Sequence, residues 1–149
     1  MPSRSVAREF LGQRRIAVVG VSRNKDDFSR LVFKKFQDRG YEVYAVNPAG
    51  ESTESMQFYP SVRDLPEPVD GALLMVPATR SESVIRDCQA AGIRRVWLYG
   101  SGHQGGSVSP EAMALARSTG MSVVDGICPL MFIGGFPHNI HRWFTHFEP

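Results

Sequence analysis

The sequence predicts an α/β fold, a doubly wound parallel sheet of five strands in a single domain that spans residues 1–149. Short apolar runs alternate along the chain with segments whose apolar residues recur at helical spacing, which is typical of a parallel sheet covered by helices. Glycine, proline or a helix-capping residue marks most of the boundaries between these segments. The 149 residues, 42% hydrophobic and 21% charged, are enough to bury one core.

The first half of the chain predicts two strands with a helix between them. Residues Ile16–Gly20 form a short apolar run, which indicates a buried strand. A helix follows, and its apolar face consists of four residues at positions i, i+3, i+4 and i+8: Phe28, Leu31, Val32 and Phe36. Gly40 is placed to end this helix. Residues 41–48 form the second strand, and Pro48 ends it because proline cannot extend a ladder.

Shorter elements surround these strands. Upstream, apolar residues on one side indicate a short docking helix: Val6, Phe10 and Leu11. A loop is expected over residues 49–57, and residues 61–68 fit one helical turn closed by prolines.

The second half continues the alternation. Residues 70–77 are apolar along their length, which indicates a strand covered on both faces. Ser81 is expected to cap a helix that ends at Gly92 and turns three residues inward: Val84, Ile85 and Cys88. The fourth strand is residues 94–100.

The last part of the domain closes the pattern. A glycine- and serine-rich loop, residues 100–109, leads to a helix with Ser109 as its N-cap and Pro110 in its first turn. Gly120 ends that helix, and residues 121–126 form the fifth strand. The tail, residues 136–147, places aromatic and apolar residues at helical spacing.

Right-handed crossovers leave few orders for such a sheet, and we predict the order 3-2-1-4-5, a Rossmann-like arrangement. The third strand then lies outside the second, and the switch point falls between the first and fourth strands. Ligands of open α/β sheets bind beyond the carboxyl ends of the strands at this point. We therefore expect the site in four segments that follow strands: residues 20–25, 47–48, 76–79 and 99–106.

Charge and composition exclude several function classes. The net charge of +2 is too small to indicate nucleic-acid binding, and no apolar run reaches the length of a membrane span. Two cysteines do not form a disulfide framework, so we expect reduced thiols and a cytoplasmic protein. No paired carboxylates or Ser-His-Asp order indicates a catalytic site.

The turn after the first strand is typical of an anion site. Gly20 allows a tight turn and a close ligand approach, and Ser22 offers an amide and a hydroxyl. The next helix begins near residues 26–29, where amide groups and the helix dipole favour a diphosphate. Arg23 and Lys25 add positive charge. A plain strand-to-helix turn with solvated basic residues is the alternative.

The end of the second strand distinguishes between nucleotides. Enzymes that bind NAD place an acidic residue there, whereas this chain has Asn47 followed by Pro48. A neutral residue does not repel a phosphate on the ribose. The second and third glycines of the G-x-G-x-x-G fingerprint are also missing. NAD is therefore disfavoured, and a ligand with a phosphorylated ribose, NADP included, is allowed.

Three stretches in this order resemble a known family: IAVVGVSRNKDDFSRLVFKKFQDRGYEVYAVNP, YPSVRDLPEPVDGALLMVPA and AGIRRVWLYGSG. The chain is similar, over residues 12–128, to stand-alone CoA-binding domains and to the CoA-binding domains of succinyl-CoA ligase alpha subunits and ADP-forming acyl-CoA ligases. The resemblance implies a Rossmann-like fold that binds coenzyme A or an acyl-CoA. Tyr99 departs from the glutamine of many relatives, and the glycine-rich loop after it is longer.

The residues implied to bind the cofactor follow from this resemblance together with the turn. They are Gly20, Val21, Ser22, Arg23, Asn24, Lys25, Ser29, Asn47, Pro48, Val76, Pro77, Ala78, Tyr99 and Gly100. The diphosphate belongs at the first turn, Asn47 and Pro48 border the adenosine end, and residues 76–78 line the path of the adenine or pantetheine. No catalytic residue and no metal ligand is predicted.

Several reactive side chains have simpler interpretations. His103 is expected to be a loop histidine rather than a general base, and Cys88 a core residue. Cys128 is expected to be a packed thiol, although exchange with the CoA thiol is the alternative. Three tail histidines, His138, His141 and His146, lack further ligands for zinc. The aromatic side of the tail is expected to pack on the domain or on a second subunit.

Our hypothesis from the sequence is a module that binds CoA without catalysis, as a carrier, a sensor or a ligase-associated unit. A homo-oligomer or a ligase partner subunit is left open. The alternatives are an NADP-dependent oxidoreductase or redox sensor and an interaction domain with a decayed site.

Overall fold

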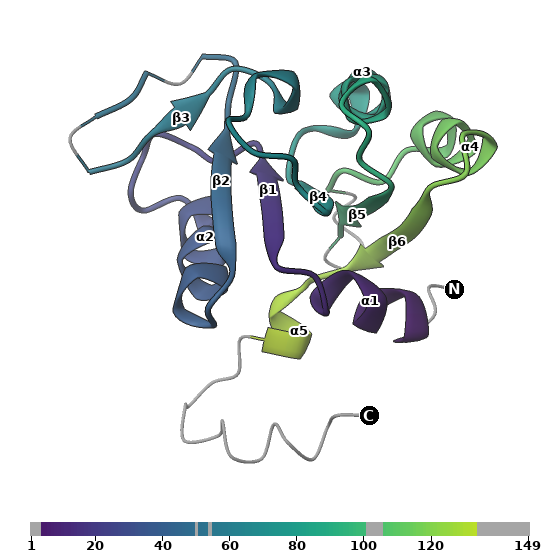
Figure 1. Cartoon of the computed structure of the whole chain (residues 1–149), viewed down its shortest axis with the longest axis horizontal. Coiled ribbons are helices and arrows are strands. Elements are labelled where there is room, and N and C mark those ends of the chain that lie inside the picture. The colour runs from purple at the N-terminus through teal and green to yellow at the C-terminus, as the bar shows by residue number, and fades with distance from the viewer. Residues whose placement is uncertain (1–3, 50, 54, 101–105, 134–149) are drawn as a thin grey trace.

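The computed structural model describes residues 4–49, 51–53, 55–100 and 106–133. These residues contain six strands: β1 (Arg15–Val19), β2 (Glu42–Val46), β3 (Phe58–Tyr59), β4 (Gly71–Leu74), β5 (Arg95–Tyr99) and β6 (Ser122–Ile127). The helices are α1 (Arg4–Leu11), α2 (Phe28–Asp38), the 3₁₀ turn η1 (Val62–Asp64), α3 (Ala78–Ala90), α4 (Pro110–Ser118) and α5 (Leu130–Ile133). The α/β class and the Rossmann-like architecture are confirmed (Figure 1).

The strands form one parallel sheet in the order β3-β2-β1-β4-β5-β6. The predicted count of five strands is wrong by one, because the pair Phe58–Tyr59 extends the sheet beyond β2. The predicted placement of the third apolar strand is also wrong. Gly71–Leu74 pairs with β1, with Ile16 opposite Gly71, while β3 takes the outer position beside β2. The switch point therefore lies between β1 and β4.

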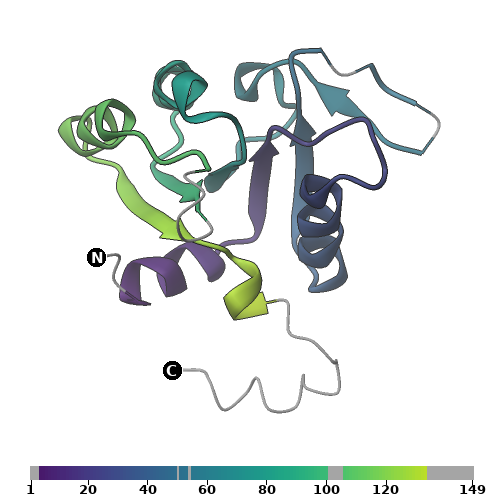
Figure 2. The ribbon, with the colours of Figure 1, turned by 180° about the vertical axis from the view of Figure 1, so that it is seen from behind.

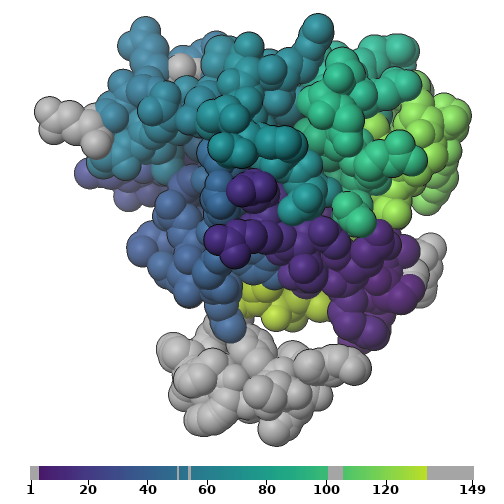
Figure 3. Space-filling view, viewed as in Figure 1, coloured from purple at the N-terminus to yellow at the C-terminus, as the bar shows by residue number. Residues whose placement is uncertain are grey.

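Helices cover both faces of the sheet (Figures 1 and 2). Alternate residues of β1 face opposite sides: Ala17 and Val19 pack with the cluster under α3 and α4, and Ile16 and Val18 pack with the cluster under α1, α2 and α5. In the space-filling view α1 (purple) lies along the lower side of the molecule with α5 (yellow) beneath it (Figure 3). This double cover explains why the central strands are apolar along their length.

Helix ends follow the residues that the sequence singles out. Gly40, Gly92 and Gly120 each stand just past a helix C-cap with a positive φ, as predicted. Ser109 caps α4 by accepting a hydrogen bond from the Ala112 amide, with Pro110 as the first helical residue. The N-terminal docking helix is confirmed as α1.

Two predicted details are wrong. Ser81 does not cap a helix, since α3 begins at Ala78 and Ser81 lies buried inside it, donating to the Ser107 carbonyl at 2.6 Å. The predicted apolar face of α2 is only partly buried. Val32 and Phe36 lie in the core, whereas Phe28 and Leu31 are exposed. The tail, residues 136–147, lies outside the described residues.

Candidate functional site

The carboxyl ends of β1, β2 and β4 bring most of the predicted residues together. The Gly20 amide donates to the Val46 carbonyl at the end of β2 (2.8 Å), and the Met75 amide donates to the Val19 carbonyl at the end of β1 (2.8 Å). The Asn47 side chain reaches back across the same edge to the Val21 carbonyl (2.8 Å). Residues 20–21, 47–48 and 75–78 therefore border one site at the switch point.

The turn at Gly20 can be formed only without a side chain. Its φ is +104°, and a Cβ built there would lie 2.4 Å from the Met75 carbonyl oxygen and 3.1 Å from a methyl carbon of Val76. The chain thus leaves β1 pressed against the end of β4. This close approach fixes where the following amides point.

The loop from Val21 to Ser29 uses some of its amides internally. The Ser22 amide donates to Ser29 Oγ at 2.9 Å, and the Asn24 amide donates to Ser22 Oγ at 3.0 Å. The amides of Val21, Arg23 and Lys25 have no acceptor among the described residues. Arg23 and Lys25 are exposed, so their amides are available to an anion, whereas the Ser22 amide is used within the loop and Val21 is fully buried.

The N-terminus of α2 already carries a carboxylate. Asp27 is its N-cap and accepts hydrogen bonds from the Ser29 amide (2.9 Å) and hydroxyl (2.7 Å). These two hydrogen bonds hold the pKa of Asp27 below its usual value. The sequence predicts free amides at this helix end. In the structure the Asp27 carboxylate already accepts from the Ser29 amide, so this amide is not free for an anion.

Arg30 of α2 supports this loop through two hydrogen bonds. Its Nη1 donates to the carbonyls of Ser22 and Arg23, both at 3.2 Å. Both carbonyls are thereby held by a side chain of α2. Arg23, Asn24 and Lys25 themselves are exposed, and Arg23 and Lys25 add positive charge at the rim.

The Asn47 side chain links two backbone segments by hydrogen bonds. Its amide group donates to the Val21 carbonyl, and its side-chain oxygen accepts from the Ala49 amide (2.9 Å). An aspartate could not donate to Val21. The residue type that argues against NAD in the sequence thus has a structural role as well.

Ser107 locks the ends of β4 and β5 together. It is fully buried, and its Oγ accepts from the Val76 amide at 2.9 Å and donates to the Val76 carbonyl. Its own amide donates to the Tyr99 carbonyl (2.9 Å). This contact joins the predicted segments at residues 76–78 and 99–100, and nothing in the sequence pattern singled it out.

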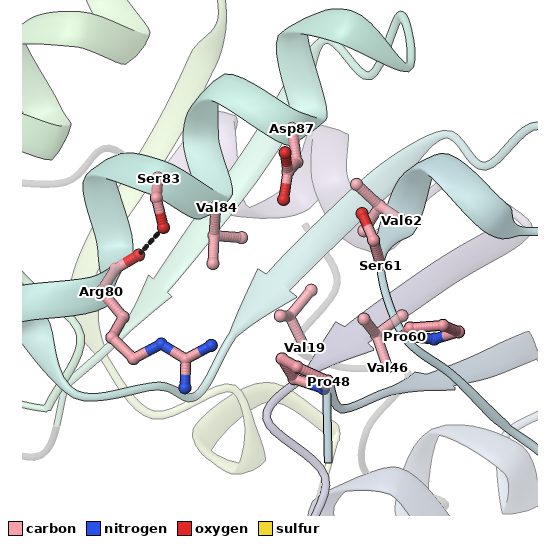
Figure 4. A pocket seen from close by; sticks show the side chains of 10 residues that line it. All are labelled: Val19, Val46, Pro48, Pro60, Ser61, Val62, Arg80, Ser83, Val84 and Asp87. Carbon is pink, nitrogen blue, oxygen red and sulfur yellow. Dashed lines mark hydrogen bonds between the residues drawn. The ribbon is translucent and has the colours of Figure 1, made fainter. Parts of the chain in front are cut away.

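A small pocket of about 50 Å³ opens between the ends of β1 and β2 and the outer side of α3. Its lining is Val19, Val46, Pro48, Pro60, Ser61, Val62, Arg80, Ser83, Val84 and Asp87. Figure 4 shows α3 carrying Arg80 at one end of the pocket and Asp87 at the other, with Pro48 opposite. Apolar walls with a cation and a carboxylate at the ends suit a polar aromatic group.

Of the predicted residues, only Pro48 lines this pocket, and sequence reasoning missed Arg80, Ser61 and Asp87. A signal for Arg80 was present, because it stands one helical turn after Pro77 at the end of a predicted strand. Asp87 also lies 4.0 Å from Arg63 of η1, which places a second cation beside the pocket.

The far end of the edge holds Tyr99, Gly100 and Cys128. Gly100 packs on Gly126, and a Cβ added at Gly100 would lie 2.6 Å from the Cα of Gly126. Burial raises the pKa of the Cys128 thiol, although hydrogen bonds with the Leu130 backbone and with Tyr99 partly oppose this shift. Burial raises the pKa of Cys88 to about 12, as expected of a core thiol. Neither thiol is activated.

Other reactive groups give no site among the residues described. No group of three or more His, Cys, Asp or Glu side chains there could hold a metal ion. No helix in the described ranges is both long and apolar enough to cross a bilayer. His103 and the three tail histidines lie outside these ranges.

Comparison with known proteins decides the family. The sequence profile of the CoA binding domain matches residues 14–133. The chain belongs to the CoA binding domain family. This finding confirms the resemblance on which the sequence interpretation drew.

Relatives of this CoA-binding domain include ligases and a protein of similar size. The alpha subunit of ADP-forming acetate–CoA ligase II from Pyrococcus furiosus is 29% identical over 125 residues. That match covers 80% of this chain but only 27% of the subunit. The uncharacterized protein YneT of Bacillus subtilis is 28% identical, over 85% of this chain and 91% of YneT. This chain thus spans about a quarter of the ligase subunit and most of YneT.

Solved structures with a similar fold are found as well. A hypothetical protein from Pyrococcus horikoshii OT3 has a TM-score of 0.77 at 27% identity, with 89% of this chain and 93% of that one covered. The dinucleotide-forming acetyl-coenzyme A synthetase 1 of Ca. Korarchaeum cryptofilum, in its apo form, has a TM-score of 0.64 at 30% identity. There the match covers 75% of this chain and 26% of the synthetase.

Proposed function

We propose that the chain binds coenzyme A or an acyl-CoA without catalysing a reaction on it, as a carrier, a sensor or a ligase-associated module. The diphosphate lies on the loop after Gly20 and is held by the amides of Arg23 and Lys25. The observation that carries this proposal is the close approach of Gly20 to Met75, because it leaves that loop with open amides at the switch point.

The adenosine end belongs in the pocket beside Pro48. The pocket holds only part of a nucleotide, and its walls are the ends of β1 and β2 and one side of α3. Arg80 stands at its end and is exposed, so its guanidinium can meet a phosphate on the ribose. Asn47 puts no negative charge beside that phosphate.

The two cysteines support a module that carries out no thiol chemistry. Catalysis by a thiol requires the thiolate, and burial raises the pKa of both Cys88 and Cys128. Binding alone needs only the amides, the pocket and the positive rim. The acyl group then remains attached to the ligand.

A thermal-shift panel tests the proposal. CoA, dephospho-CoA, NADPH and NADH are compared at equal concentration, because a ligand that binds only the folded chain raises its melting temperature. We expect the largest shift with CoA, a smaller one with dephospho-CoA and the smallest with NADH. A larger shift with NADPH than with CoA would contradict the proposal.

A matched pair of variants on α3 tests the role of the pocket. Arg80→Gln removes the cation at the pocket and should reduce the preference for CoA over dephospho-CoA. Arg86→Gln is the control, since Arg86 is exposed on the same helix and pairs with Glu82 at 2.9 Å instead of lining the pocket. Equal preferences in the two variants would remove Arg80 from the site.

A further inference from the structure

The pocket beside Pro48 has a charged group at each end of the wall that α3 forms. Four residues of α3 line this wall at positions i, i+3, i+4 and i+7, so they lie on one face of the helix: Arg80, Ser83, Val84 and Asp87. At about 1.5 Å per residue, Arg80 and Asp87 are about 10 Å apart along the helix axis. A purine nucleotide has a similar length, measured from a phosphate on its ribose to the far edge of its base.

The Asp87 carboxylate has acceptor capacity left for a ligand. Its side chain is 39% exposed, and its ion-pair partner Arg63 lies 4.0 Å from Oδ1, which is too far for a hydrogen bond. Within the described ranges no donor forms a hydrogen bond with this carboxylate. A carboxylate accepts several hydrogen bonds, so a donor on the ligand can bind to Asp87 without displacing a contact within the protein.

Ser61 supplies a hydrogen-bond donor at the same end of the pocket. It is the N-cap of η1, and η1 also carries the Arg63 that pairs with Asp87 (Figure 4). Ser61 Oγ accepts from the Arg63 amide at 3.1 Å, which leaves the hydroxyl hydrogen to donate to a ligand. The Asp87 end of the pocket therefore presents both an acceptor and a donor.

An acceptor together with a donor matches one edge of adenine. That edge carries the 6-amino group, which is a donor, next to N7, which is an acceptor. A 6-oxo purine presents two acceptors there, O6 and N7, so its O6 would face the Asp87 carboxylate with no hydrogen between them. The apolar side chains of Val19, Val46 and Val84 suit the faces of either flat ring. The polar end of the pocket, and not its walls, thus distinguishes the two bases.

We propose that Asp87 makes this chain selective for a 6-amino purine. Its carboxylate accepts from the 6-amino group of the CoA adenine, the Ser61 hydroxyl donates to N7, and Arg80 meets the phosphate on the ribose. This inference rests on the proposed function, which places the adenosine end in this pocket, and it adds the residue that identifies the base.

Calorimetry of the full chain with coenzyme A and with deamino-coenzyme A tests the inference. In deamino-coenzyme A a 6-oxo group replaces the 6-amino group and the rest of the ligand is unchanged. We expect the wild type to bind coenzyme A about tenfold more tightly, or better. In Asp87→Asn the side-chain amide can accept from the amino group or donate to the oxo group, so the ratio of the two affinities should fall to about one.

Two control variants separate this role of Asp87 from its charge and its ion pair. Glu82→Gln makes the same chemical change on α3 outside the pocket lining, and Arg63→Gln removes the ion-pair partner but keeps the carboxylate. Both variants should keep the affinity ratio of the wild type, and circular dichroism checks that every variant is folded.

The outcomes for the base and for the ligand are distinguishable. Equal affinities of the wild type for the two ligands, or an unchanged ratio in Asp87→Asn, would overturn the selectivity of Asp87 while CoA binding still supports the proposed function. A wild type that binds neither ligand would overturn both.

Discussion

Substitution of Gly20 by alanine tests the geometry on which the site depends. The methyl group would meet the Met75 carbonyl oxygen at 2.4 Å, and the backbone would keep a φ of +104° that L-residues disfavour. The backbone conformation costs about 1–2 kcal/mol. Relief of the overlap requires a backbone shift in β1 or β4, which costs about 1–3 kcal/mol more.

The loss of stability in Gly20→Ala is therefore about 2–5 kcal/mol, the sum of these two contributions. Gly40→Ala separates them. Gly40 has a similar φ of +95°, but a Cβ at this position would meet nothing within 4 Å, so only the cost of the conformation, about 1–2 kcal/mol, applies. Urea unfolding followed by circular dichroism measures both variants.

Binding separates the two variants further. A shift at Gly20 displaces the loop whose Arg23 and Lys25 amides hold the diphosphate, and we expect CoA affinity by calorimetry to fall about tenfold or more in Gly20→Ala. Gly40→Ala should bind as the wild type does. Equal stability losses in the two variants, or an unchanged CoA affinity in Gly20→Ala, would refute the reasoning.

Three further perturbations have defined outcomes. Ser107→Ala leaves the buried Val76 amide without an acceptor and should lower the free energy of unfolding in urea by about 1–3 kcal/mol. The control, Ser118→Ala at an exposed position, should change it very little. Equal losses in the two variants would contradict the role of Ser107 in joining β4 and β5. The pKa of Asp27 is lowered in the folded chain, so its contribution to stability is present above the unfolded pKa of about 3.9 and is lost as pH falls through the folded pKa. The stability difference between wild type and Asp27→Asn should therefore shrink on acidification, and a difference independent of pH would refute this. Ser22→Asp should weaken CoA binding while the chain stays folded, and calorimetry that shows unchanged affinity would remove Ser22 from the site.

The parts of the fold that the sequence predicts are those with a local cause. Apolar runs covered on both faces indicate the central strands, and Gly40, Gly92 and Gly120 end helices because each adopts a positive φ. Ser109 and Pro110 begin α4 through capping that involves only neighbouring residues. These signals need no knowledge of the rest of the chain.

The parts that escaped prediction depend on distant contacts. Two residues, Phe58 and Tyr59, carry too little periodicity to indicate a strand, yet β3 occupies the outer edge and moves the third apolar strand beside β1. Ser81 has the residue type of an N-cap, but its partner is the Ser107 carbonyl 26 positions along the chain.

The candidate site likewise has residues that the sequence indicates and residues that only the folded structure brings together. The turn at Gly20 and the end of β2 are visible in the sequence because they follow apolar strands. Arg80 is indicated only by its place one helical turn after Pro77, and Asp87 is not indicated at all, since α3 brings it to the pocket only when the helix packs beside η1. The internal hydrogen bond of the Ser22 amide is likewise a property of the folded loop.

Nuclear magnetic resonance of the isotope-labelled chain, titrated with coenzyme A, tests the central claim most directly. We predict that the largest amide shifts fall on Arg23 and Lys25 and on the segments that line the pocket at Pro48 and Arg80, whereas α1 is unaffected. Saturating shifts confined to another surface, or none at all at millimolar ligand, would contradict the claim that this loop holds the diphosphate.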